Sequence, residues 1–293
     1  MGKHLVTGGA GFIGSHLVAA LLERGDTVRV LDNISTGRRS NVDQFRGKIE
    51  FIEGDLVNHA DVERAVDGVE FVFHQAALAS VPRSVAAPLD TNAACVTGTV
   101  NLLDAARQSS VKRVVYAGSS SVYGDRTAGA AKRETDLPNP VSPYAAAKAA
   151  GELYCQAFTA AYGLPTVTVR YFNVFGPGQD PKSEYAAVIP KFVTEMIAGR
   201  RPTIFGDGHQ SRDFTYVANV VDGNLLAAEA PDASGGTFNV ACGEQLSLLD
   251  LVAAINRVLG TKIEPIFEPP RIGDVRDSLA DISAARKVLG YEP

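Results

Sequence analysis

Short β-branched runs alternate with amphipathic helical stretches from the start of the chain to Arg170. These runs are Leu5–Thr7, Thr27–Leu31, Ile49–Ile52, Phe71–His74, Val114–Ala117 and Thr166–Arg170. Such alternation is typical of right-handed βαβ units, which build a parallel sheet with helices on both faces. The sequence therefore predicts an α/β fold with a doubly wound parallel sheet.

The alternation ends after the segment "RYFNVFGPGQDP", where glycines and prolines interrupt the pattern. The later strands and helices are shorter and less regular. We therefore expect a sheet domain at 1–173, with a return segment at about 215–241 that adds a late strand at Thr237–Val240. Residues 174–214 and 242–293 are expected to form a smaller α/β substrate lobe.

Charge and composition narrow the range of partners. The 293 residues carry a net charge of -5, so the chain lacks the excess of basic residues that nucleic-acid binding requires. No apolar run approaches the ~18 residues of a membrane span, and glycines occupy the place of a signal peptide's apolar core. We expect a cytoplasmic protein with a small-molecule partner and no membrane contact.

Cysteine and histidine spacing gives no sign of a disulfide framework or a metal site. Cys95, Cys155 and Cys242 lie far apart, and their odd number favours a reducing compartment. The five histidines include no pair at ligand spacing. No metal is expected.

A glycine-rich turn, "TGGAGFIG", joins the first predicted strand to the first predicted helix. Gly8, Gly11 and Gly14 leave room for a pyrophosphate to approach the backbone at a helix N-terminus, where free N–H groups and a partial positive charge lie. A tight turn packed against a helix is the alternative interpretation of such a motif. The motif alone leaves both open.

Asp32 adds context to the turn, because it follows the second strand 18 positions after Gly14. A carboxylate at this spacing accepts the ribose hydroxyls of NAD and repels the extra phosphate of NADP. Arg38 and Arg39 could bind that phosphate, but they fit a solvated loop better. The sequence therefore favours NAD as the cofactor.

Tyr144 and Lys148 lie four residues apart in "SPYAAAK" and so share one helix face. Lowering a phenol pKa from ~10 to ~7 requires about 4 kcal/mol, and one cation at ~4 Å supplies about that much at an effective dielectric of ~20. With the positive charge of nicotinamide, this predicts Tyr144 as a general base. Otherwise Tyr144 packs in the core and Lys148 is solvated.

The segment "YAGSSSVYG" closes an apolar strand shortly before Tyr144. Active-site residues of doubly wound sheets gather at such carboxyl ends of strands. The three serines either form a polar turn or include one hydroxyl that donates a hydrogen bond to the reacting oxygen. The nearby tyrosine and lysine favour the second interpretation.

The chain resembles the extended short-chain dehydrogenase/reductase family, which has a Rossmann domain, and within it the nucleotide-sugar 4-epimerases. The resemblance covers nearly the whole chain through "TGGAGFIG", "GDL", "HQAA", "SSSVYG", the YxxxK pair, "RYFNVFGP", "GDGHQSRDF" and "RIGDVRDSLAD". It implies tightly held NAD, a UDP-sugar substrate and a homodimer built from the helices around 91–107 and 144–160.

The resemblance also implies roles for individual residues. Ser119 binds the reacting oxygen, Tyr144 is the base and Lys148 tunes it, while the sugar passes through a 4-keto intermediate without net redox. The implied cofactor residues are Gly8, Gly11, Phe12, Ile13, Asp32, Asn33, Ser35, Thr36, Gly37, Asp55, Leu56, Gln75, Ala76, Ala77, Tyr144, Lys148 and Tyr171. The implied substrate residues are Ser80, Ser119, Tyr144, Asn173, Ala187, Val188, Thr203, Phe205, Arg212, Leu248, Arg271, Asp274 and Ser278.

Three residues narrow the choice of reaction and of sugar substrate. Ser120 and Ser121 stand where related dehydratases and decarboxylases carry acidic residues, so a 4-epimerase is expected. The resemblance implies a tyrosine at the position of Ser278 in relatives that are restricted to non-acetylated hexoses. In this chain the residue is small, which leaves room for an N-acetyl group. We therefore expect UDP-N-acetylglucosamine and UDP-N-acetylgalactosamine as the main pair, with UDP-glucose and UDP-galactose as a second activity.

Alternative functions remain open on the sequence alone. A UDP-glucuronate 4-epimerase needs a positive group near the sugar carboxylate, for which Arg83 is a candidate. A non-catalytic, NAD-sensing protein would lack the serine, tyrosine and lysine that this chain retains. Cys95 replaces an asparagine that relatives usually place near the cofactor.

Overall fold

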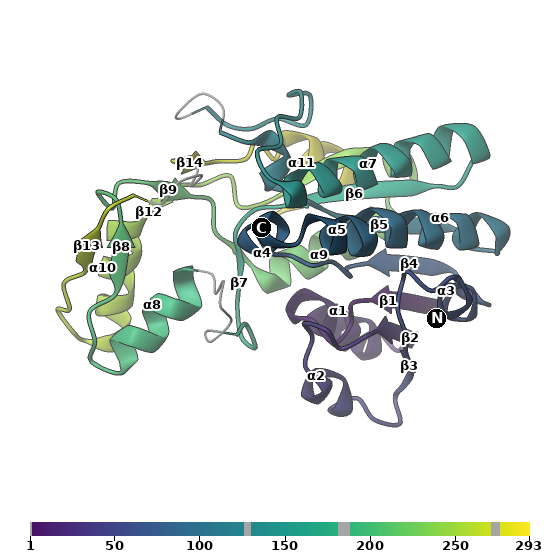
Figure 1. The fold of residues 1–293 in the computed structure, drawn as a ribbon, viewed down its shortest axis with the longest axis horizontal. Coiled ribbons are helices and arrows are strands. Elements are labelled where there is room, and N and C mark those ends of the chain that lie inside the picture. Colours follow the sequence, from purple (N-terminus) through teal and green to yellow (C-terminus); the bar gives the residue numbers. More distant parts are fainter. Residues whose placement is uncertain (1, 126–129, 181–187, 271–275) are drawn as a thin grey trace.

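The computed structural model describes residues 2–125, 130–180, 188–270 and 276–293. Its centre is a parallel sheet of seven strands (Figure 1). The strands are β1 (Lys3–Thr7), β2 (Thr27–Asp32), β3 (Ile49–Glu53), β4 (Phe71–His74), β5 (Arg113–Ser119), β6 (Thr166–Tyr171) and β11 (Thr237–Val240). The predicted α/β fold with a doubly wound sheet is confirmed.

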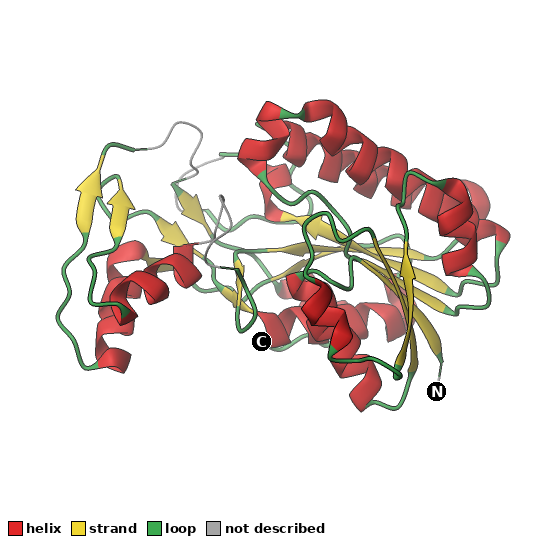
Figure 2. Cartoon of the chain, turned by 60° about the horizontal axis from the view of Figure 1, so that its bottom comes forward, coloured by secondary structure: helices red, strands yellow, loops and turns green. Residues whose placement is uncertain are grey.

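Helices cover both faces of this sheet (Figure 2). One face packs against α1 (Phe12–Glu23), α9 (Val217–Glu229) and α11 (Ser283–Leu289). The other face packs against α3 (His59–Val66), α6 (Gly98–Gln108) and α7 (Pro143–Tyr162). In β1, Leu5 and Val6 point into different cores, which explains why two consecutive residues of this strand are apolar.

The strands lie in the order β11-β6-β5-β4-β1-β2-β3. The direction in which the chain adds successive strands therefore changes between β1 and β4, although all the strands are parallel. The chain builds the sheet outward from β1 to β3 and then returns to place β4 on the other side of β1. Loops that leave the carboxyl ends of β1 and β4 therefore diverge and leave a crevice between them. This topology positions the candidate site.

Short elements connect the strands to the larger helices. They are α2 (Arg39–Asp43), α4 (Val81–Ala86), α5 (Pro88–Asn92), the π-helical turn η1 (Ala93–Thr97), and the 3-10 turns η2 (Ser120–Tyr123) and η3 (Pro231–Ala233). α5 and η1 lead directly into α6, so one winding helical segment runs from Pro88 to Gln108.

A smaller set of elements lies at one end of the molecule, on the left in Figure 1. Its helices are α8 (Val188–Ile197) and α10 (Leu248–Leu259), which share a core that includes Phe192, Met196 and Val252. Its strands are β8 (Thr203–Phe205), β9 (Ser211–Arg212), β12 (Leu246–Ser247), β13 (Ile266–Glu268) and β14 (Asp277–Ser278). A separate parallel pair, β7 (Val174–Phe175) and β10 (Thr215–Tyr216), lies between this end and the main sheet.

The division into a sheet domain and a substrate lobe stays a proposal. The C-terminal helix α11 packs on the main sheet, since Ala285 and Leu289 belong to the same core as Val240 of β11. Among the described residues, no helix is long and apolar enough to cross a membrane.

Candidate active site

The glycine turn between β1 and α1 has little room for side chains. Gly8 has a φ of +71°, and a Cβ there would lie 2.6 Å from the backbone nitrogen of Ala76. A Cβ on Gly14 would lie 2.2 Å from the carbonyl oxygen of Gly8. Glycine is therefore required at both positions for the close approach of three backbone segments. The free N–H groups of the first turn of α1 begin directly after Gly11.

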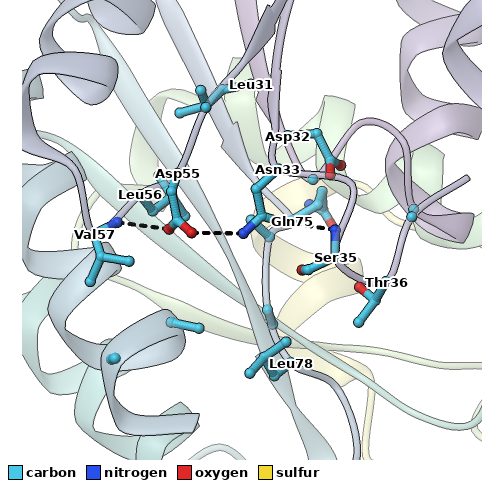
Figure 3. A pocket seen from close by; sticks show the side chains of 18 of the residues that line it. Leu31, Asp32, Asn33, Ser35, Thr36, Asp55, Leu56, Val57, Gln75 and Leu78 are labelled. Carbon is cyan, nitrogen blue, oxygen red and sulfur yellow. Dashed lines mark hydrogen bonds between the residues drawn. The ribbon is translucent and has the colours of Figure 1, made fainter. Parts of the chain in front are cut away.

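A cavity of about 350 Å³ opens beside this turn at the carboxyl edge of the sheet (Figure 3). The structure brings many of the cofactor residues expected from the sequence to its wall: Gly8, Gly11, Asp32, Asn33, Ser35, Thr36, Gly37, Asp55, Leu56, Gln75, Ala76 and Ala77. The wall also includes residues that the sequence analysis missed: Leu31, Gly54, Val57, Leu78, Arg83, Asp90, Ala93 and Ala94.

Polar side chains at the end of β2 hold the cavity wall in place. Asp32 accepts the backbone N–H groups of Ala10 at 2.9 Å and Ile34 at 2.8 Å. Burial raises the pKa of Asp32, and these two hydrogen bonds oppose that rise. Asn33 donates to Asp55 at 2.8 Å (Figure 3), which joins the β2 loop to the β3 loop. The glycine cradle and this carboxylate edge fit a dinucleotide with a pyrophosphate and a ribose.

Tyr144 and Lys148 occupy the first two turns of α7. Ser142 caps this helix by accepting the N–H of Ala145 at 3.2 Å, and Pro143 supplies the first helical residue. The Lys148 Nζ lies 6.0 Å from the centroid of the Tyr144 ring. It donates to the carbonyl oxygen of Ala117 in β5 at 2.8 Å, so the ammonium is anchored to the sheet.

Ser119 ends β5 and meets Tyr144 there. Its Oγ accepts the backbone N–H of Ser121 at 3.2 Å and the hydroxyl of Ser121 at 2.8 Å. Its side chain also shares a hydrogen bond with the Tyr144 side chain. Because both Ser121 groups donate to the Ser119 oxygen, the Ser119 hydroxyl proton points away from Ser121 and toward Tyr144.

The pKa of the Tyr144 phenol is shifted in the opposite direction from the lowered value that the sequence analysis expected. Burial raises the pKa of Tyr144 to about 12, and the hydrogen bond from Ser119 offsets only part of this effect. Burial also lowers the pKa of Lys148. Because the ammonium is held on Ala117 rather than on the phenol oxygen, desolvation outweighs its attraction for the phenolate.

Three of the expected substrate residues meet at β9 and β14. Arg212 and Ser278 are register partners in these strands. Asn173 donates to the carbonyl oxygen of Asp213 at 3.0 Å and lies 3.4 Å from the Oγ of Ser278. Asn173 has a φ of +35°, an unusual backbone conformation outside glycine. Ser278 is buried, with 6% of its surface exposed.

The remaining expected substrate residues lie in several places. Ser80 caps α4 by accepting the N–H of Arg83. Val188 and Leu248 pack in the core shared by α8 and α10, and Thr203 and Phe205 lie on β8. Ala187, Arg271 and Asp274 lie outside the described residues. Phe12 and Ile13 begin α1, beside the cavity's glycine turn.

Buried polar residues that the sequence analysis did not single out support the crevice. His74, at the end of β4, contacts the hydroxyls of Thr7 at 2.8 Å and Thr99 at 2.9 Å. The Thr99 hydroxyl donates to the carbonyl of Cys95, so it accepts from His74, which assigns the ring proton to Nε2. Burial lowers the pKa of His74 to about 3.

A second network joins Tyr171 to the loop after β4. The Tyr171 hydroxyl lies 2.9 Å from the side-chain nitrogen of Gln75 and 2.9 Å from the side-chain oxygen of Asn224 in α9. Tyr171 was expected to contact the cofactor, and the structure places its hydroxyl on Gln75, a residue of the cavity wall. Sequence spacing could not reveal Asn224, which lies far along the chain.

Comparison with known proteins agrees with this geometry. The profile of the NAD dependent epimerase/dehydratase family matches residues 4–241. The chain belongs to this family. Membership makes NAD its cofactor, in agreement with the cavity described above.

Alignments with relatives of this family member cover almost the whole chain. A UDP-glucose 4-epimerase of Mycolicibacterium smegmatis is 43% identical over 99% of this chain and 93% of its own length. The structure of a UDP-N-acetylglucosamine 4-epimerase from Methanobrevibacter ruminantium, in complex with UDP-N-acetylmuramic acid, is 42% identical with a TM-score of 0.95, covering 100% of this chain and 93% of that one. A UDP-glucuronic acid 4-epimerase from Bacillus cereus is 32% identical with a TM-score of 0.91, covering 99% and 94%.

Proposed function

We propose that this family member is a UDP-sugar 4-epimerase that interconverts UDP-N-acetylglucosamine and UDP-N-acetylgalactosamine and also accepts UDP-glucose and UDP-galactose. The observation that carries the proposal is the convergence of Ser119, Tyr144 and Lys148 at the carboxyl end of β5. The relatives named above act on UDP-sugars at the same carbon, which supports the reaction class.

The chain's own residues perform the proton transfers in this proposal. Ser119 donates a hydrogen bond to the sugar oxygen at C4 and keeps its proton, while Tyr144 removes the proton of the C4 hydroxyl as the hydride leaves C4. Lys148 holds positive charge behind the phenol through its bond to Ala117. NAD, when bound, supplies the hydride acceptor and donor that interconvert the C4 alcohol and ketone. Burial raises the pKa of Tyr144 to about 12, and in this proposal the positive charge of the oxidised cofactor opposes that rise and favours the phenolate.

The small side chain of Ser278 supports the proposed sugar preference. This residue is buried and lies next to Asn173 and opposite Arg212. A small side chain there leaves room for an N-acetyl group at C2, whereas an aromatic ring would fill the space. We propose that Asn173 and Arg212, with Arg271 and Asp274 outside the described residues, hold the nucleotide diphosphate.

UDP-glucuronate is the second candidate substrate, because a UDP-glucuronate 4-epimerase of Arabidopsis thaliana is 35% identical over 99% of this chain and 72% of its own length. Arg83 was the residue expected to bind the sugar carboxylate. It lies on the wall of the cofactor cavity instead, which weakens this alternative.

Direct observation of C4 inversion tests the proposed function. The purified protein, without added cofactor, is mixed separately with UDP-N-acetylglucosamine, UDP-glucose and UDP-glucuronate and followed by proton NMR. We expect fastest inversion of the N-acetylated sugar and slower inversion of UDP-glucose. Absence of inversion with all three would overturn the proposal, and a clear preference for UDP-glucuronate would overturn the sugar assignment.

We also propose that the protein is a homodimer in the cytoplasm. The helical face formed by α5 and α7 exposes apolar side chains, including Leu89 at 83% and Leu153 at 62%. Burial of such side chains in a second copy is favourable. The cysteines Cys95, Cys155 and Cys242 are free thiols, in keeping with a reducing compartment.

A further inference from the structure

The charges on the cofactor cavity are unbalanced. Its described wall carries three aspartates, Asp32, Asp55 and Asp90, and Arg83 is the basic residue among the described side chains that line it. A dinucleotide brings a pyrophosphate with two negative charges into this cavity. Carboxylates repel such a group, so binding benefits from a cation placed close to it.

Two of the three aspartates, Asp32 and Asp55, already accept hydrogen bonds from neighbouring loops. Asp32 accepts two N–H groups, and Asp55 accepts the amide of Asn33 and the N–H of Val57 at 3.0 Å. They shape the ribose and adenine end of the cavity rather than neutralise Arg83. The described residues contain no carboxylate within 4.0 Å of the Arg83 guanidinium and no hydrogen-bond acceptor for it.

The first turn of α4 fixes the backbone position of Arg83. Ser80 caps α4 by accepting the Arg83 N–H at 3.2 Å, and Pro82 stiffens the first turn. The side chain is half-buried, so its guanidinium is partly desolvated at the cavity wall. α4 follows the loop Gln75–Leu78, which lines the cavity together with the glycine turn.

We propose that Arg83 binds the NAD pyrophosphate and slows the release of the cofactor between turnovers. A guanidinium offers paired N–H donors that match phosphate oxygens and bind them more strongly than neutral donors do. The backbone N–H groups at the start of α1 approach the same group from the glycine turn. The bound pyrophosphate is then held between two separate elements of the fold. An epimerase regenerates its oxidised cofactor in every cycle and gains from a slow release.

The test measures cofactor release rather than activity. Wild type, Arg83→Gln, Arg83→Lys and a control, Arg39→Gln, are loaded with radiolabelled NAD, and the label is chased with unlabelled NAD. Arg39 is an exposed residue that pairs with Glu53 near the same end of the sheet, so its variant removes an equal charge without touching the cavity wall. Release is followed at two salt concentrations.

We expect Arg83→Gln to release NAD about 10- to 100-fold faster than wild type, as loss of a charge-assisted hydrogen bond implies. Arg83→Lys should fall between the two, because it keeps the charge and loses the paired donors. Arg39→Gln should match wild type within about twofold, in line with the small effect of exposed ion pairs. Arg83→Gln should also lose part of the salt dependence of release.

Two results would overturn the proposal. One is equal NAD release from Arg83→Gln and Arg39→Gln. The other is unchanged release together with a raised KM for UDP-glucuronate alone, which would place Arg83 on the sugar. Should Arg83→Gln fail to fold in saturating NAD, Arg83→Lys decides the question, because wild-type release from that variant would contradict the paired contact.

Discussion

The hydroxyl of Ser121 lies 2.8 Å from the Oγ of Ser119, and the Ser121 backbone N–H donates to the same oxygen at 3.2 Å. In the proposed reaction, these contacts hold the Ser119 hydroxyl in position to bind the reacting oxygen. We expect Ser121→Ala to lower kcat about 5- to 10-fold with little change in KM, since one positioning hydrogen bond is lost. Ser119→Ala should cost about 100-fold. Steady-state kinetics check both, and equal losses in the two variants would contradict a positioning role for Ser121.

Removal of the Tyr144 hydroxyl should stop the chemistry and spare binding. We expect Tyr144→Phe to lower kcat by about 10²- to 10⁴-fold, the usual contribution of a general base. Calorimetric titration with UDP, which lacks the sugar, should give the wild-type Kd within about twofold. A loss of UDP binding accompanied by substantial turnover at saturating sugar would show that Tyr144 holds the nucleotide instead.

Ser278 should control the size of the C2 substituent that fits the site. We expect Ser278→Tyr to reduce kcat/KM for UDP-N-acetylglucosamine at least 100-fold, because the added ring would occupy the volume that the proposal assigns to the N-acetyl group. UDP-glucose should lose less than about fivefold. Ser278→Ala is the matched control, since it removes the hydroxyl without adding volume, and both sugars should tolerate it. Equal losses of both sugars in Ser278→Tyr would reject the volume argument.

His74 should make the protein less stable in mild acid. Burial lowers its pKa from 6.5 to about 3, so the unfolded chain binds one more proton than the folded chain between these values. The contribution is complete above pH ~6.5 and is lost as the pH falls, with a slope that approaches about 1.4 kcal/mol per pH unit. Urea unfolding of wild type and His74→Gln at pH 7 and pH 5 measures it. The difference in unfolding free energy between the two pH values should shrink in the variant; an identical difference would show that other groups cause the acid sensitivity.

The exposed apolar face of α5 and α7 should mediate self-association. We expect Leu153→Asp to convert a dimer into monomers, because it places a charge within the contact. Val258→Asp is the control, since Val258 is 85% exposed on α10, a helix outside this face. Sedimentation velocity at several concentrations gives the masses. A Leu153→Asp variant that remains dimeric, or a wild type that is monomeric at all concentrations, would refute this interface.

Much of the main sheet could be predicted from the sequence because its strands are short runs rich in apolar and β-branched residues that alternate with amphipathic helices. Val6 and Val28 lie in one core and Leu5 and Leu31 in the other, so apolar residues of these strands face both sides of the sheet. The strands of the smaller end are different. β9, β12 and β14 have two residues each, too few for any periodicity, and they form through pairing with distant segments.

The candidate site was predictable where one local segment carries the chemistry. Tyr144 and Lys148 share a helix, and the glycine turn is a single short motif. His74 was not predicted, because its partners Thr7 and Thr99 are brought close to it only by folding. The acidic Tyr144 expected from Coulomb's law also depends on geometry, because Lys148 turns toward Ala117 and burial then dominates the phenol's pKa.

Retention of the C4 hydrogen through a reaction cycle tests the central claim most directly. UDP-N-acetylglucosamine deuterated at C4 is incubated in ordinary water with the purified protein, and the product is analysed by NMR and mass spectrometry. The account predicts UDP-N-acetylgalactosamine that keeps its deuterium at C4, because the hydride leaves and returns within one closed site. Inversion with loss of deuterium to water, or no inversion at all, would contradict it.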